Sequence, residues 1–212
     1  MARAHEVLGG RWTLLVVREI LCGSRRFNDI RRGIPRISRT MLSERLQELV
    51  AVGVLSHHKG HHGPEYDLTE SGRELIELIK AMGAWGQRWL PRHAAREDLD
   101  AQPLLVDMAR RVRADALPPE PIVLRFEIEG ERHPRFMLLK ASEVSLCTQN
   151  PGFPEAVRIR APLSALVAWW RGDTDFAQAQ RMGLSVEGSK ALVRAFPEWF
   201  DRYLFAEIGP AA

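Results

Sequence analysis

The most concentrated chemistry in this sequence lies in the arginines between residues 25 and 45. Seven arginines and only two carboxylates fall in these 21 residues, a surplus of five positive charges. They are Arg25, Arg26, Arg31, Arg32, Arg36, Arg39 and Arg45, against Asp29 and Glu44. A guanidinium stays protonated at physiological pH and forms paired hydrogen bonds to phosphate, so it suits anion binding better than proton transfer. The segment therefore predicts a surface that binds a polyanion.

A helix predicted to begin after Ser38 would present part of this charge. Ser38 is a favourable N-cap and Gly53 a favourable end. The apolar face of this helix consists of Leu42, Leu46 and Leu49. Its other face carries Arg39, Thr40, Ser43, Glu44 and Gln47. Because arginine reads guanine through two hydrogen bonds in the major groove of DNA, we expect Arg39 to read a base.

The remaining basic side chains would hold the phosphates on either side of that helix. The expected phosphate contacts are Arg25, Arg26, Arg31, Arg32, Arg36 and Lys59. For any one arginine a second interpretation stays open, in which it belongs to a solvated basic surface that binds nothing.

The sequence on either side predicts the helices and strands that surround this helix. Apolar residues at helical spacing predict two earlier helices, one through Leu14, Val17 and Leu21 and one through Phe27, Ile30 and Ile34. A hairpin follows, with strands in residues 54–59 and 65–68, and then a longer helix capped by Thr69 or Ser71. Three helices, a hairpin and a helix form the order of a winged helix-turn-helix domain.

Four stretches of sequence carry a family resemblance. They are Gly9-Gly10-Arg11-Trp12, Arg26-Phe27-Asn28-Asp29-Ile30, Ile37 to Leu46, and Tyr66 to Gly72. Through them, residues 4–91 resemble the HxlR family of bacterial winged-helix regulators. The resemblance implies a dimeric transcription factor in which residues 38–52 recognise double-stranded DNA and residues 57–64 form the wing. Many members carry a cysteine shortly before the Gly-Gly-Arg-Trp element, used in some for thiol sensing, whereas residues 1–8 contain none; Cys22 is expected to be an inert core thiol.

The long helix after residue 70 carries more apolar surface than a small domain easily buries. Its apolar stripe consists of Leu75, Leu78, Met82, Trp85 and Trp89. We expect part of it to form a homodimer interface that presents two recognition helices about one turn of DNA apart, in line with the resemblance. The alternative is that the stripe packs against a second domain.

Histidines gather at the tip of the predicted hairpin. They are His57, His58, His61 and His62. Imidazoles at this spacing could bind zinc, but no cysteine or carboxylate set completes a site, so we expect no metal and no cofactor. A weaker hypothesis is that their protonation below about pH 6.5 adds positive charge and tightens phosphate binding.

Length and composition predict two globular domains. The chain has 212 residues, 45% of them hydrophobic and 27% charged, only two cysteines, and no apolar run typical of a signal peptide or membrane span. The charge is +6 over residues 1–96 (16 basic, 10 acidic) and −3 beyond (14 basic, 17 acidic). We predict a cytoplasmic protein with a winged-helix domain in residues 1–91, a linker in 92–102 and a second domain in 103–212.

The second domain is predicted to be α+β. Strands expected in residues 122–128, 135–140, 144–148 and 156–161 suggest an antiparallel sheet, and helices and a fifth strand near 184–187 follow. Asn150-Pro-Gly-Phe153, the turn Trp169 to Asp173, Gly183 to Gly188 and Phe196 to Phe200 are similar to the SCP2-like, sterol-carrier fold. That resemblance implies helices that roof an apolar cavity.

Candidates to line such a cavity are aromatic or large apolar. They are Phe126, Phe136, Leu138, Leu146, Trp169, Trp170, Trp199 and Phe200. Ordinary core packing is the alternative for each aromatic residue. No catalytic motif occurs in this half, so an enzyme is not expected.

Together these observations favour a homodimeric transcription regulator whose second domain binds a small apolar effector. The alternative is a carrier of lipids or other apolar ligands, or a hydrolase, in which the helical domain serves mainly for dimerisation. The arginine-rich recognition segment argues against this alternative.

Overall fold

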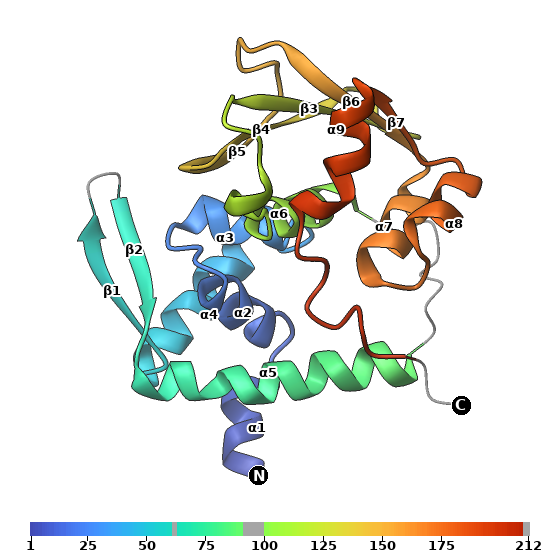
Figure 1. Cartoon of the computed structure of the whole chain (residues 1–212). Helices are drawn as coiled ribbons and strands as arrows, with labels where there is room; N and C mark the ends of the chain where they lie inside the picture. Colours follow the sequence, from blue (N-terminus) through green and yellow to red (C-terminus); the bar gives the residue numbers. More distant parts are fainter. Residues whose placement is uncertain (61–62, 91–99, 210–212) are drawn as a thin grey trace. The chain divides into compact units, whose positions relative to one another are not determined.

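The computed structural model describes residues 1–60, 63–90 and 100–209, which form two compact units, residues 1–86 and 87–212 (Figure 1). Each unit has its own hydrophobic core. The predicted linker lies mostly outside the described residues, and a helix already begins at Ala101, inside its last two positions. No helix within these ranges is long and apolar enough to cross a membrane.

The first unit contains the predicted order of elements. It comprises α1 (Ala2–Leu8), α2 (Thr13–Leu21), α3 (Phe27–Gly33), α4 (Arg39–Ala51), the antiparallel hairpin β1 (Leu55–Gly60) and β2 (Gly63–Leu68), and most of α5 (Glu70–Trp89), whose last three residues belong to the second unit. Its core takes apolar residues from α2, α3, α4 and the base of the hairpin. The winged helix-turn-helix prediction is therefore confirmed for this unit.

A close approach between two helices depends on Gly33. The carboxylate of Glu19, on α2, is buried, and a Cβ built on Gly33 would lie 1.8 Å from its Oε2. Arg18 neutralises this carboxylate through an ion pair of 2.6 Å and also donates to the carbonyl of Gly33 at 3.4 Å. Glycine at this position thus allows α2 and α3 to pack against each other.

Hydroxyl caps fix the starts of α4 and α5. The Ser38 hydroxyl accepts a hydrogen bond from the Met41 amide at 3.1 Å, as the sequence predicts for α4. For α5 the cap is Thr69, whose hydroxyl accepts from the Gly72 amide at 3.2 Å and donates to the Gly53 carbonyl at 2.7 Å. Ser71, the other candidate, donates to that same carbonyl instead.

The second unit is built on a five-stranded sheet in the order β5-β4-β3-β6-β7. Its elements are α6 (Ala101–Arg110), the short 3-10 turn η2 (Ala114–Ala116), β3 (Ile122–Ile128), β4 (Arg135–Lys140), β5 (Glu143–Cys147), β6 (Glu155–Ala161), α7 (Leu163–Arg171), α8 (Phe176–Arg181), β7 (Ser185–Gly188), α9 (Lys190–Ala195) and the 3-10 turn η3 (Phe196–Trp199). The α+β prediction holds for this unit.

The prediction of an antiparallel sheet is wrong at one strand pair. After the meander of β3, β4 and β5, the chain crosses back over the sheet, and β6 pairs with β3 in parallel. The connection spans residues 148–154, which include Asn150 and Gly152 in a tight turn closed by a hydrogen bond of 2.9 Å. The sheet is therefore mixed. Pairing between strands that are not neighbours along the chain leaves no local signal in the sequence, so this parallel pair was not predicted.

Helices cover only one face of this sheet (Figure 1). The main core lies between them and the strands and contains Leu124, Phe126, Met137 and Ile159. On the opposite face a small cluster of Val123, Phe136 and Leu138 is covered by Cys147 and Phe153, the latter from the crossing connection. Successive side chains of β3 and β4 therefore point alternately into the main core and toward the opposite face of the sheet.

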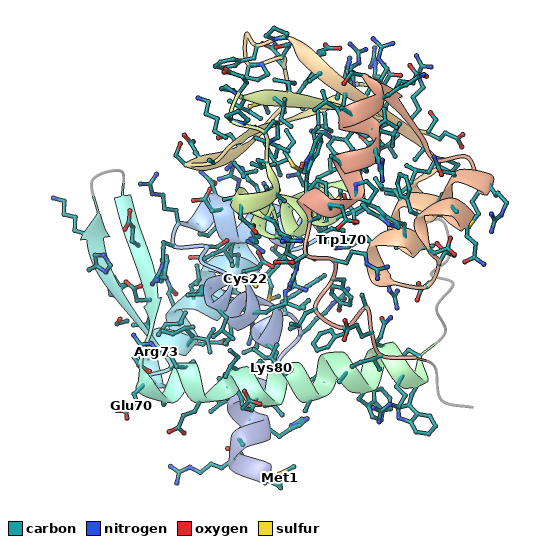
Figure 2. The ribbon with its side chains drawn as sticks, in the orientation of Figure 1. Met1, Cys22, Glu70, Arg73, Lys80 and Trp170 are labelled. Atoms are coloured by element: carbon teal, nitrogen blue, oxygen red, sulfur yellow. The ribbon has the colours of Figure 1, made fainter. Side chains whose placement is uncertain are left out.

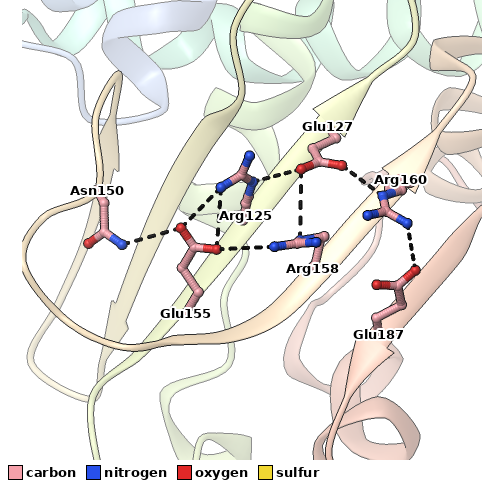
Figure 3. A network of polar contacts seen from close by, with 7 residues as sticks. All are labelled: Arg125, Glu127, Asn150, Glu155, Arg158, Arg160 and Glu187. Atoms are coloured by element: carbon pink, nitrogen blue, oxygen red, sulfur yellow. Dashed lines mark hydrogen bonds and ion pairs between the residues drawn. The ribbon is translucent and has the colours of Figure 1, made fainter.

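Ion pairs cover the rest of that opposite face (Figure 3). Glu127 accepts hydrogen bonds from Arg160 at 2.7 Å and from Arg125 at 2.8 Å, and Arg160 also contacts Glu187 at 2.9 Å. The hydrogen bond from Arg160, assisted by the charge of Arg125, holds the pKa of Glu127 below its ordinary value of 4.5, although partial burial acts in the opposite direction. The same bond raises the pKa of Arg160.

This network predicts how the second unit responds to acid. A carboxyl whose pKa is lowered by folding stabilises the fold above its unfolded pKa and loses that contribution as the pH falls through its folded pKa. The stability of wild type should therefore fall below about pH 4.5 more than that of Glu127→Gln, and the two curves should converge. Calorimetry between about pH 3 and 7 measures this. Glu120→Gln, an exposed control, should run parallel to wild type; a parallel Glu127→Gln curve would contradict the prediction.

Candidate nucleic-acid interface

Helix α4 has one buried face and one polar face. Leu42, Leu46 and Leu49 are at most 1% exposed and lie in the core of the first unit. The residues predicted to meet DNA lie along the other side: Ser38, Arg39, Thr40, Glu44 and Gln47 are exposed, and Ser43 is half-buried. The helix therefore presents a continuous polar surface that begins at its capped N-terminus.

Part of the predicted positive charge is neutralised by ion pairs, and the two pairs with the hairpin are not evident from the sequence. Four of the seven arginines have carboxylate partners: Arg25 pairs with Asp67, Arg26 with Glu65, Arg32 with Asp29 and Arg45 with Glu48. Two of these partners lie in the hairpin, about forty residues away in sequence. The local count of charges overstates the charge available to a phosphate.

The hairpin and the segment before α3 form one charged cluster. The Tyr66 amide donates to the Arg25 carbonyl at 2.8 Å, so this segment pairs with β2. Nδ1 of His58 lies 3.3 Å from Asp67, and its Nε2 lies 3.8 Å from Glu65. We call Arg25, Arg26, His58, Glu65 and Asp67 the wing cluster. Glu65 and Asp67, at alternate positions of β2 and so on one side of the strand, were the only signal of it in the sequence.

Three of the predicted basic contacts, Arg31, Arg39 and Lys59, form no ion pair with any described residue. Arg39 and Lys59 are exposed. Arg31 is half-buried, and its Nε is buried without a hydrogen-bond partner in the described part of the chain. Arg36 is exposed and takes part in a polar contact. The cations best placed to meet a phosphate or a base are Arg39 and Lys59.

The structure describes two of the four wing histidines and also Cys22. His57 and His58 lie on β1, whereas His61 and His62 lie outside the described residues. Among the described residues no group of three potential ligands could hold a metal ion. Cys22 is not the core thiol that its apolar surroundings in sequence suggested, because it is exposed at the C-terminal end of α2 (Figure 2).

The apolar stripe of α5 divides into a buried and an exposed part. Leu75 packs against the core of the first unit. Leu78, Met82, Trp85 and Trp89 are exposed by 42–58% of their surface. Their spacing of four, three and four residues places all four on one side of the helix, as in the seam of a coiled coil.

The eight residues predicted to line a cavity do not lie together. Phe126, Trp169, Trp170, Trp199 and Phe200 belong to the main core of the second unit, and Leu146 packs at its margin. Phe136 and Leu138 lie in the small cluster on the opposite face of the sheet. Phe136 pairs with Arg125 rather than with Phe126, so strand alternation separates it from the other aromatic rings. One cavity cannot use all eight.

Comparisons with known proteins agree with the geometry of the first unit. Residues 7–94 match the family model described as HxlR-like helix-turn-helix. The SCP2-like resemblance concerns residues outside this match and stays a prediction. An uncharacterized HTH-type transcriptional regulator of Mycobacterium tuberculosis is 37% identical over 136 residues, which cover 57% of this chain and 84% of the relative.

Other relatives match a shorter part of the chain. The uncharacterized HTH-type transcriptional regulator YvaP of Bacillus subtilis is 35% identical over 91 residues, 42% of this chain and 84% of YvaP. The reduced form of the transcriptional regulator YodB from Bacillus subtilis is 32% identical, with a TM-score of 0.39, and covers 44% of this chain and 95% of that one. On its sequence and the arrangement of its first unit, the chain belongs to the HxlR-like helix-turn-helix family.

Proposed function

We propose that the protein is a transcription regulator that reads double-stranded DNA with α4 as a homodimer. The observation that carries the proposal is the exposed polar side of this capped helix, with Arg39 at its first turn and in no ion pair with any described residue. An exposed helix of this kind fits the major groove, and its N-terminal residues reach the base edges. The names of the relatives, HTH-type transcriptional regulators, support the same function.

The exposed stripe of α5 supports the homodimer. Four large apolar side chains on one side of a helix favour burial against a like surface, because an isologous interface pairs each residue with a copy of the same stripe. Two copies of α4 would then meet two half-sites related by the same two-fold symmetry. The stripe belongs to α5, the helix that directly follows the wing, so dimerisation would fix the spacing of the DNA-reading units.

Selection from random duplexes with the full chain tests this function. We expect enrichment of an inverted repeat whose half-sites lie about one helical turn apart. The affinity for it should fall with salt along a slope of about 0.9 per phosphate contact. Failure to enrich any sequence, together with no salt-dependent binding to random DNA, would refute the proposal.

The wing cluster predicts an unusual response to loss of negative charge. Asp67→Asn or Glu65→Gln should free Arg25 or Arg26 for a phosphate, so that affinity for any DNA rises several-fold and the salt slope steepens by about 0.9. Fluorescence anisotropy at several salt concentrations measures both quantities. Glu77→Gln makes the same charge change on α5, where Glu77 pairs with Lys80, and should leave the slope unchanged. Weaker binding by both wing variants would show that these pairs only hold the wing in place.

The second unit is proposed to bind a small apolar effector. Trp199 supports this, because its ring packs edge-on against Phe196 and its buried Nε1 has no hydrogen-bond partner in the described residues. A buried N–H without an acceptor is costly, so an apolar ligand with a carbonyl or hydroxyl oxygen would suit it. Trp170, nearby in the same core, donates to Asp107 at 2.8 Å and needs no such ligand. A panel of fatty acids, sterols and aromatic compounds that neither raises the melting temperature nor changes DNA affinity would exclude an effector of these classes.

A further inference from the structure

One arginine of α4 points away from the polar surface proposed to read DNA. Arg45 follows Leu42 by three residues and precedes Leu49 by four, so it lies at the border of the buried face rather than beside Thr40, Glu44 and Gln47. Only 21% of its side chain is exposed, and it pairs with Glu48 one turn further along the helix. Its position is unsuited to a phosphate contact, although its charge belongs to the basic segment.

The guanidinium of Arg45 lies instead against the turn that joins α1 to α2. A Cβ built on Gly10 would stand 2.8 Å from Nη1 of Arg45 and 2.8 Å from the Thr13 hydroxyl. Nε of Arg45 and that hydroxyl are both buried, and neither has a hydrogen-bond partner among the described residues. Because Gly10 has no Cβ, the guanidinium of Arg45 can occupy the space beside it.

The turn itself has an unusual backbone. Trp12 has φ 77°, the only positive φ of a non-glycine residue in the described chain. A left-handed conformation is costly for such a residue and persists when its surroundings impose it. The side chain of Arg11 lies 4.8 Å above the Trp12 ring, and the Thr13 amide donates to the Gly10 carbonyl at 3.1 Å. Arg45 therefore contacts a turn whose backbone conformation is constrained.

We infer that Arg45 is a positioning residue, which sets the placement of α4 by resting on the Gly10 turn and so decides which base edges Arg39 reaches. This inference rests on the proposed DNA-reading function. Base readout depends on sub-ångström placement, whereas phosphate contacts tolerate small shifts of a long side chain. Loss of the Arg45 contact should therefore reduce discrimination between sequences more than overall affinity. It also gives a role to the Gly-Gly-Arg-Trp element, which is remote from α4 in sequence.

Two variants on different elements test the inference. Arg45→Met keeps the length of the side chain but removes the guanidinium. Gly10→Ala keeps the guanidinium but fills the space beside it, so that the flexible end of Arg45 must move and the Thr13 hydroxyl must rotate. Arg73→Met, at an exposed position on α5, serves as the control. Affinities of the full chain for its selected site and for random duplex are measured at several salt concentrations, along with the melting temperature.

We expect both variants to lower the ratio of specific to random affinity by about five- to tenfold. This is the lower end of the discrimination that one base contact contributes. Affinity for random DNA and its salt slope should stay as in wild type. Equal losses on both DNAs, with a slope smaller by about 0.9, would identify Arg45 as a phosphate contact and overturn the inference. An unchanged ratio in Gly10→Ala would overturn it even if Arg45→Met fails to fold. If wild type binds no DNA at all, the proposed function fails first, which is a distinct result.

Discussion

Replacing Arg39 with alanine is expected to cost at least about tenfold in affinity for the selected site and little on random DNA. Arg39 is exposed on the first turn of α4 and has no ion pair among the described residues. A bidentate contact to guanine contributes about 1–3 kcal/mol of discrimination. Since a dimer would use this contact in both half-sites, the loss approaches about a hundredfold if the two contacts add.

The matched control for this prediction is Arg39→Lys. Lysine keeps the positive charge but lacks the planar fork, so it should preserve random binding while losing most of the discrimination. Lys59→Ala, on the wing, should instead lower affinity for all sequences alike and reduce the salt slope by about 0.9. Equal losses by Arg39→Ala on selected and random DNA would refute the base-reading role.

Replacing Trp85 with glutamate is expected to convert the dimer to a monomer. Trp85 is 58% exposed and lies with Met82 and Trp89 on one side of α5. A carboxylate at the centre of an apolar interface would be buried opposite its own copy, where two like charges lack counter-ions. Light scattering should then report a single chain of 24.1 kDa instead of twice that mass.

DNA binding should fall with the dimer. A dimer that binds two half-sites has an affinity about 10²–10⁴-fold higher than one unit bound to one half-site, and a monomer lacks this increase. Ile76 offers a matched control, because it is also exposed on α5 but lies on a different side of the helix from the stripe. Ile76→Glu should leave the mass unchanged. A wild-type chain that is monomeric at micromolar concentration would remove the dimer from the proposal.

The sequence predicted the first unit closely because its determinants are local. The helices follow from apolar spacing of three and four residues, α4 begins where Ser38 can cap it, and the hairpin follows from two short strands around a glycine-rich turn. Each of these signals lies within about ten residues. The polar side of α4 follows directly from that periodicity, so Thr40, Glu44 and Gln47 could be placed on it without a structure. Arg39 precedes Leu42 by three residues and is exposed because it begins the helix.

The pairings between residues far apart in sequence depend on the tertiary fold. The parallel pair of β3 and β6 depends on a chain crossing that no periodicity records, and strand alternation then separates Phe136 from Phe126. The wing cluster brings Arg26 next to Glu65, and the Gly10 turn receives Arg45. By itself, the sequence determined which residues carry charge and which face of each helix is apolar, because both are set by residue type and spacing. Which charges remain available to a ligand was decided by folding, since a partner's charge acts through distance in space.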